Sequence, residues 1–221
     1  MTNFNVIIPV VYPALCADLL RSMEANTLLP ERVIVLDNTE HRDYQPTSTK
    51  FQIDTYHSVS GKVNESWNIG VSVVDIGADY VSILNDDIVL NEWFFQRVTE
   101  TFKSEFHCTV ACPLSVNSWE DFGRGKRKRD IKKMRKREGF AFTFKKAHLD
   151  MIAPIPIHRI ETFHGDDWYW YWTNVRGLFW YQDVGNIIFH HVGSSVLALG
   201  YRSMKKIERN EWIKIMEELG G

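Results

Sequence analysis

The chain has 221 residues, of which 44% are hydrophobic and 24% charged, with a formal net charge of −2. These values are typical of a globular protein with a sizeable core, and no apolar run approaches the roughly 20 residues needed for a membrane span. The three cysteines lack metal-ligand spacing, which argues against a disulfide framework and a zinc site. The N-terminus has no secretory pattern, and we expect a cytoplasmic protein.

The first half of the chain alternates apolar strands with amphipathic helices. Strands are predicted at 4–9, 32–37, 51–56 and 80–84, and helices from Pro13, from Val63 and from Trp93. The strands are apolar throughout, which is typical of a sheet covered on both faces. We therefore expect an α/β fold with a mostly parallel central sheet and helices on both sides.

The second half has a less regular pattern. Its predicted elements are a strand at 139–144, a helix from Lys145, a pair of strands at 179–182 and 186–190, and a terminal amphipathic helix around 207–219. We find no internal repeat and no low-complexity linker, and this favours a single folding unit.

Charge is concentrated in one segment, residues 124–137. This segment holds ten Lys or Arg and one Asp, a local charge of +9, so the rest of the chain carries −2 − 9 = −11. It is either a mobile solvated loop or a docking site for a polyanion, and the spacing of Ile131 and Met134 predicts that part of it is helical. Nucleic acid is one candidate because so many charges could contact several phosphates, although no base-reading motif is present.

Acidic residues follow two of the predicted strands. Asp37 ends one strand, and Asn85-Asp86-Asp87 ends another. In parallel sheets such ends share one ligand-binding crevice. Carboxylates there suit Mg²⁺ or Mn²⁺, whereas the structural alternative is a turn whose Asp caps the helix starting near Asn91.

Two further patterns carry candidate chemistry. The run GDDWYWYW at 165–172 places Asp166 and Asp167 beside large aromatic rings. One interpretation is a general base next to a bound sugar or nucleobase, and the other is an acidic turn before a core helix. The segment HHVGSS at 190–195 follows a strand, so His190 or His191 could bind a metal or a phosphate, although a histidine there is often structural.

The order of these features resembles the family 2-like glycosyltransferases of the GT-A fold, from Phe4 to about Ser195. VIIPV at 6–10, with Pro9, resembles the opening strand of that family, and VIVLDNTE at 33–40 resembles its second strand. The segment 61–90 is similar to the N-x-G helix followed by the LNxD variant of the D-x-D metal motif. Four residues fill those motif positions: Asn68, Gly70, Asn85 and Asp87.

The resemblance continues on the acceptor side of the chain. FHGDDWYWYW is similar to the family's ED motif, with Asp166 at the Glu position and Asp167 at the Asp position. HHVGSS resembles the closing His element, where His191 fits the spacing better and His190 is the alternative. Tyr169 and Thr173 stand where the family often has a further acid and a basic residue.

The resemblance implies one GT-A domain over 1–221, with a nucleotide-sugar half (1–115), an acceptor half (116–200) and a C-terminal helix (201–221). It implies metal-dependent transfer of a sugar from a nucleoside diphosphate sugar to an acceptor hydroxyl, with inversion, while a retaining reaction is the alternative on the same fold. The acceptor could be polyanionic: nucleic acid, a phosphorylated glycan or a lipid diphosphate. The alternatives are a nucleotidyltransferase, although the phosphate loop expected of one is missing, and a non-catalytic anion-binding module.

Roles for individual residues follow from the same resemblance. Asp87 would hold Mn²⁺ or Mg²⁺, with Asn85 or Asp86 assisting and with His191 or His190 as the histidine at the metal. Asp167, or else Asp166, would be the base. The donor-side residues would be Pro9, Asp37 (contacting the base or ribose), Asn68, Asn85 and Asp86.

Overall fold

The computed structural model describes residues 2–123, 129–136, 139–191 and 202–220, with the backbone alone for 202–204. Its elements in chain order are β1 (Phe4–Val10), α1 (Pro13–Glu24), β2 (Arg32–Asp37), β3 (Gln52–His57), α2 (Val63–Ser72), β4 (Tyr80–Leu84), β5 (Ile88–Leu90), α3 (Phe94–Ser104), β6 (Cys108–Val116), α4 (Trp119–Gly123), β7 (Ile131–Lys133), β8 (Ala141–Lys145), α5 (Lys146–Leu149), α6 (Gly165–Val175), β9 (Phe179–His190) and α8 (Arg202–Glu218).

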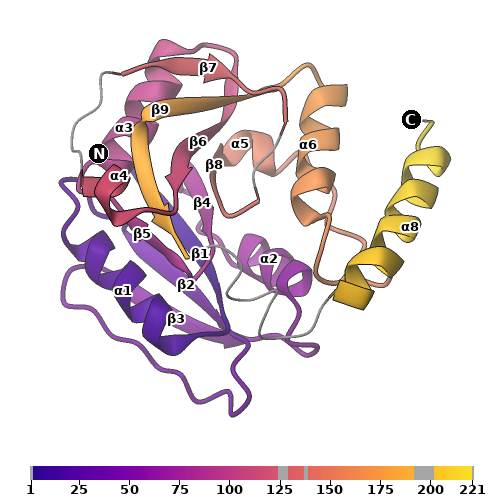
Figure 1. Ribbon diagram of the computed structural model, residues 1–221, viewed down its shortest axis with the longest axis horizontal. Helices are drawn as coiled ribbons and strands as arrows, with labels where there is room; N and C mark the ends of the chain where they lie inside the picture. The colour runs from indigo at the N-terminus through magenta and orange to yellow at the C-terminus, as the bar shows by residue number, and fades with distance from the viewer. Residues whose placement is uncertain (1, 124–128, 137–138, 192–201, 221) are drawn as a thin grey trace.

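One nine-stranded mixed sheet organises these elements (Figure 1). The strand order is β3-β2-β1-β4-β8-β6-β9-β5, and β7 pairs with β9 beside this path. Strands β1, β2, β3, β4, β6 and β9 run in one direction, while β5, β7 and β8 run against them. The expected α/β class with a mostly parallel sheet is therefore confirmed.

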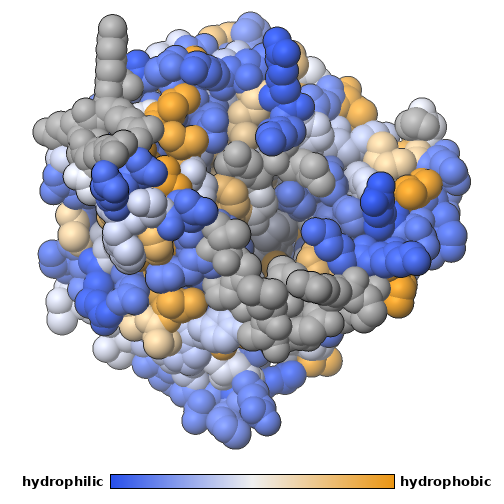
Figure 2. Space-filling model, viewed as in Figure 1, coloured by the Kyte–Doolittle hydropathy of each residue, from blue (hydrophilic) through white to orange (hydrophobic). Residues whose placement is uncertain are grey.

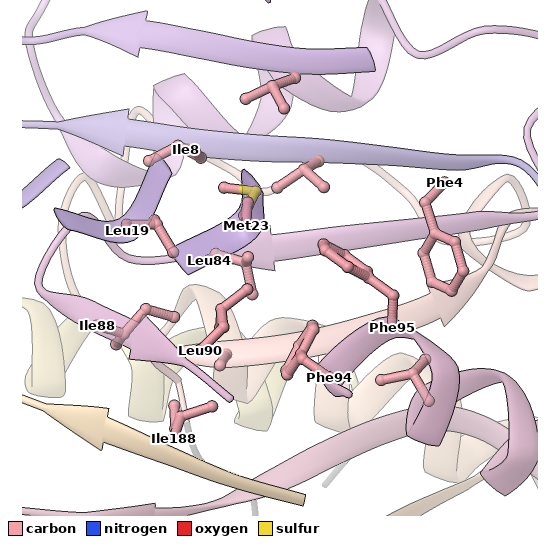
Figure 3. Packing of buried hydrophobic residues seen from close by; sticks show 14 of the residues in the cluster. Phe4, Ile8, Leu19, Met23, Leu84, Ile88, Leu90, Phe94, Phe95 and Ile188 are labelled. Carbon is pink, nitrogen blue, oxygen red and sulfur yellow. The ribbon is translucent and has the colours of Figure 1, made fainter. Parts of the chain in front are cut away.

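Helices cover both faces of the sheet, as the uniformly apolar strands predicted. On one face, α1 and α3 pack against residues such as Phe4, Ile8 and Leu84, and Figure 3 shows Phe94 and Phe95 of α3 reaching the same layer. On the other face, α2 and α6 contribute Trp67 and Tyr169 to a second cluster, which also includes Ile215 of α8. Each large apolar side chain buried in this way contributes roughly 1.5–3 kcal/mol.

Helix α2 approaches β1 closely, and this explains the glycine in the N-x-G pattern. A Cβ atom at Gly70 would lie 2.4 Å from Cγ2 of Ile7, well inside van der Waals contact. Only glycine lets α2 lie this close to the sheet. Trp67 of the same helix is buried in the cluster that also contains Ile7.

The structure corrects three predictions in the second half of the chain. The predicted strand pair at 179–182 and 186–190 is one long strand, β9, whose pairing with β6 shifts register between Pro113 and Leu114. The segment around Ile131, predicted to be partly helical, forms β7 against β9. The helix predicted from Lys145 is a single turn, α5.

The surface seen in Figure 2 is mainly hydrophilic, with apolar residues in small scattered groups. Within the described ranges, no helix has the length and apolar character required to cross a membrane.

Candidate active site

A pocket opens at the point where the order of the parallel strands reverses. The chain runs from β1 outward to β2 and β3 and then returns to place β4 on the other side of β1. In α/β sheets, ligands bind outside the carboxyl ends of the strands at such a switch point. The pocket, of about 220 Å³, is lined there by Pro9 and Val11 after β1 and by Asn85 and Asp86 after β4.

The opposite wall of the pocket comes from residues remote in sequence. Trp67 of α2 forms one part of it, and the segment 162–166, which leads into α6, forms another. The pocket therefore brings Asn85 and Asp86 together with Asp166. The aromatic rings at 168–172 are not among the described lining residues: they lie along α6, where Trp168 and Tyr169 are buried in the core.

Asp86 joins the two strand ends at the floor of the pocket. Its Oδ2 accepts hydrogen bonds of 2.7 Å from the backbone N–H groups of both Val11 and Tyr12. Burial raises the pKa of Asp86 to about 6; the two amide hydrogen bonds oppose this shift, and the charge of Asp87 adds to it. Asp86 thus fixes the loop after β1 and also places a carboxyl group with a raised pKa at the pocket.

Asp87 lies beside a histidine of β9. Strand β5 pairs antiparallel with β9, with Ile88 opposite His190. This pairing places Nε2 of His190 3.4 Å from Oδ1 of Asp87. The Asp87 side chain is almost fully buried and that of His190 is 15% exposed, so the pair is shielded from bulk water.

His191 takes a different direction from His190. Its backbone N–H donates to the backbone carbonyl of Asp87, but its ring lies 4.7 Å from the ring of Phe189 and 6.2 Å from that of Trp119. Successive side chains of a strand point to opposite faces, so only one of the two histidines can face Asp87. The structure brings His190, and not the favoured His191, to that carboxylate.

The two acidic residues at the start of α6 have different surroundings. Asp166 lines the pocket. Oδ2 of Asp167 instead lies 2.6 Å from Nδ1 of His164. Both carboxylates occupy the first turn of α6, where the helix dipole favours negative charge. Of the two candidates for the base, Asp166 is the one placed at the pocket.

His164 carries a strained backbone at this junction. Its φ of 64° lies in the left-handed region, which is unfavourable for most residues and which histidine adopts more readily than most. Its ring is parallel to that of Trp212 of α8, with 5.8 Å between the ring centres. Sequence patterns pointed to neither residue, because the contact joins a loop to a helix that follows 38 residues later.

The loop before α6 is fixed from both sides. Nδ2 of Asn64 donates to the carbonyl groups of Ile160 and Phe163, at 3.0 Å each. From α8, the buried carboxylate of Glu208 accepts from the N–H of Thr162 at 3.1 Å and from that of Phe163 at 2.8 Å. Helix α8 therefore holds in place the loop that forms part of the pocket wall.

Two other predicted donor-side residues lie away from the pocket. Asp37 is fully buried, and its oxygens accept from the N–H groups of Thr39 and Tyr44. Asn68 pairs with the backbone of Ile155 through both its amide nitrogen and its amide oxygen. In this structure both side chains hold loops in place.

The basic segment is described only in part, for residues 129–136. Arg129 donates to the carbonyl of Glu100, Lys132 pairs with Asp130 at 2.8 Å, and Lys133 lies over the ring of Phe179. Arg135 and Lys136 are exposed. Residues 124–128 and 137, and residues 192–195 of the HHVGSS segment, lie outside the described residues.

No model of a known protein family and no curated protein sequence matches this chain.

Proposed function

We propose that this protein transfers a sugar from a nucleoside diphosphate sugar to an acceptor hydroxyl, with inversion at the anomeric carbon. The observation that carries the proposal is the meeting of Asp86 and Asp166 in the pocket at the β1/β4 switch point, with the Asp87–His190 pair directly after Asp86 in the chain. A pocket at this place in an α/β sheet suits a nucleotide ligand. The resemblance of the chain to GT-A glycosyltransferases points in the same direction.

The donor would enter along the ends of β1 and β4. Pro9, Asn85 and Asp86 line the pocket there, so we assign them to the donor. Asp37 and Asn68 would contribute indirectly, because their polar atoms are engaged with the backbone of nearby loops.

The Asp87–His190 pair fits a divalent cation. A carboxylate oxygen and an imidazole nitrogen are both ligands that Mn²⁺ accepts, and they lie 3.4 Å apart at a shielded position. Among the described residues, no group of three or more His, Cys, Asp or Glu side chains could hold a metal ion, so this part of the chain would supply two ligands. Mn²⁺ or Mg²⁺ held by such a pair typically takes its other ligands from phosphate oxygens and water, and it would neutralise charge on the departing diphosphate.

Asp166 would act as the base because, of the two carboxylates at the start of α6, it is the one that lines the pocket. It would take the proton of the acceptor hydroxyl while the acceptor oxygen forms a bond to the anomeric carbon. The bond from that carbon to the diphosphate oxygen breaks in the same step, and the diphosphate leaves with the electron pair. One such displacement inverts the anomeric centre.

The acceptor would be polyanionic. Ten Lys or Arg within 124–137 precede the strand β8. Such a concentration of positive charge favours a ligand with several phosphates, and binding would weaken steeply with salt.

A ligand screen tests the proposal. We expect a nucleoside diphosphate with Mn²⁺ to raise the melting temperature, and one or more sugar conjugates to release nucleotide slowly when no acceptor is present. UDP, GDP, UDP-glucose, UDP-N-acetylglucosamine and GDP-mannose form the first panel. If no member of a complete nucleotide panel stabilises the protein, the transferase assignment is wrong and an anion-binding module is favoured. If nucleoside triphosphates alone stabilise it, a nucleotidyltransferase is favoured.

A further inference from the structure

Three side chains of the pocket wall hold buried polar atoms whose hydrogen-bonding capacity is unused within the described residues. They are Trp67 with Nε1, Thr162 with Oγ1 and His164 with Nε2. The Trp67 side chain belongs to the core, where only 4% of the residue is exposed. A buried polar group without a partner is costly, so three around one pocket call for a ligand.

The chemistry of the three atoms indicates which kind of ligand they suit. The indole N–H of Trp67 can only donate, and the hydroxyl of Thr162 can donate or accept. The position of the hydrogen on the His164 ring follows from its neighbour Asp167. The Asp167 carboxylate lies 2.6 Å from Nδ1 and accepts a hydrogen bond from it, so Nδ1 carries the hydrogen. In the neutral ring Nε2 is then an acceptor.

While the ring of His164 is neutral, a fully ionised phosphate does not match this set, because it has no hydrogen to offer Nε2. A hydroxyl group both donates and accepts, so neighbouring hydroxyl groups can satisfy an indole N–H and an imidazole nitrogen together. The ring of Trp67 also adds an apolar surface next to these polar atoms.

We propose that Trp67, Thr162 and His164 form a subsite that binds the hydroxyl groups of a sugar. The assignment rests on the proposed glycosyl transfer and divides the pocket into two regions. Asn85 and Asp86, after β4, would face the nucleotide end of the donor, and the wall made by Trp67 and 162–164 would face the sugar.

The surrounding contacts hold this subsite in shape before a ligand arrives. Glu208 binds the N–H of Thr162, and Asp167 and Trp212 contact the ring of His164. Groups that are already ordered lose little conformational entropy on binding, so their hydrogen bonds contribute more fully to affinity.

Two substitutions remove single polar atoms with little change of shape. Thr162→Val replaces the hydroxyl with a methyl group and keeps the backbone N–H that Glu208 binds. His164→Asn removes Nε2, keeps an amide N–H near Asp167, and suits the left-handed backbone because asparagine adopts it readily.

Thr109→Val is the matched control. Thr109 is also fully buried with an unused hydroxyl, but it lies on β6 and is not among the described residues that line the pocket. Removing an unused hydroxyl should leave the melting temperature of the free protein unchanged or raise it in both threonine variants. Only Thr162→Val should then change sugar binding.

The measured quantity is the ratio between the affinity for a nucleotide sugar and the affinity for the same nucleotide without its sugar. Calorimetry with UDP-glucose and UDP, or with another matched pair from the panel, gives both affinities. We expect Thr162→Val and His164→Asn each to reduce this ratio about threefold to tenfold, with the affinity for the nucleotide alone unchanged. Thr109→Val should leave both values unchanged. Equal ratios in wild type and in both pocket variants, together with equal binding of methyl glycosides, would overturn the subsite.

The sugar could belong to the donor or to the acceptor, and the two sources give different results. A donor sugar predicts that the variants slow the release of nucleotide without an acceptor. An acceptor sugar predicts unchanged release, slower transfer, and weaker binding of methyl glycosides, followed by saturation-transfer NMR. If no nucleotide binds at all, the proposed function fails, and the titration with methyl glycosides tests the subsite by itself. The subsite would then be refuted if the wild type gives no glycoside signal or if the variants give the same signal as the wild type.

Discussion

Nε2 of His190 lies 3.4 Å from Oδ1 of Asp87, although 103 positions (190 − 87) separate the two residues. The contact follows from the register of β5 on β9, which places Ile88 opposite His190. Backbone pairing at the edge of the sheet therefore selects one of two adjacent histidines as the partner of the carboxylate.

We expect Asp87→Ala and His190→Ala each to weaken Mn²⁺ binding by about 10- to 100-fold, measured by electron paramagnetic resonance titration. Each substitution removes one of the two protein ligands proposed. His191→Ala is the control, since its ring packs beside Phe189, and it should leave Mn²⁺ binding unchanged. Loss of binding in His191→Ala with normal binding in His190→Ala would reverse the assignment.

The two carboxylates at the start of α6 should differ in their effect on transfer. Asp166→Asn should lower the rate of transfer by about 10²- to 10⁴-fold with nucleotide binding retained, because it removes the proposed base. Asp167→Asn should cost less than about tenfold, since the new amide can still contact His164. Initial rates at saturating donor would separate the two, and a larger loss in Asp167→Asn would make Asp167 the base.

The raised pKa of Asp86 predicts a dependence of stability on pH. The native carboxyl group holds its proton more tightly than the unfolded one, so its stabilising contribution is complete below pH 3.8 and is lost as the pH rises through about 6. Asp86→Asn keeps an acceptor for the N–H groups of Val11 and Tyr12 and does not ionise.

Between pH 4 and pH 7, the free energy of unfolding of Asp86→Asn should therefore rise relative to that of the wild type, by on the order of 3 kcal/mol. Urea denaturation at each pH unit measures this difference. A difference that stays constant over the range would show that Asp86 is not perturbed in the folded protein.

Glu208→Gln should loosen the loop before α6. The charged carboxylate holds the N–H groups of Thr162 and Phe163, and the amide side chain offers only one acceptor atom with weaker bonds. Hydrogen exchange at these two N–H groups should become about tenfold faster or more. Glu217→Gln, on an exposed position of the same helix, is the control and should change neither rate; unchanged exchange in Glu208→Gln would mean that α8 does not hold the loop.

Gly165→Ala should destabilise the protein by roughly 1–3 kcal/mol through overpacking. A Cβ atom at this position would lie 2.2 Å from Oδ1 of Asn64 and 2.7 Å from the ring of Trp67. Gly77→Ala is the matched control, since no atom lies within 4 Å of its added Cβ. Thermal unfolding of both variants tests the prediction, and equal melting temperatures would contradict the close packing of α6 on α2.

The first half of the fold was predictable because its strands are short, apolar and bounded by turns. Arg32–Asp37 and Tyr80–Leu84 have the bounds that the sequence predicts. The strand β6 was not predicted because Pro113 interrupts its pattern, and proline is uncommon inside a central strand. The pairing of β9 with β6 shifts register near Gly185, which made one strand look like two.

The candidate site was predictable where it follows strand ends and not where it depends on long-range contacts. Asp86 and Asp166 are at the pocket, as expected of residues at a strand end and a helix start. The choice between His190 and His191 depends on strand register, which the local sequence does not encode. The contributions of Thr162, His164 and Glu208 depend on the docking of α8, and no spacing rule relates them.

The pairing of β5 also has a consequence for biosynthesis. The structure pairs Ile88–Leu90 with β9 alone among the described strands, and His190 leaves the ribosome 102 residues after its partner Ile88 (190 − 88). The parallel strands β1 to β4 can associate early in translation, while the edge that carries Asp87 must wait for the last strand. Binding of Mn²⁺ at the proposed Asp87–His190 site would therefore require β9 to be in place, and we expect chains that stop before β9 to lack it.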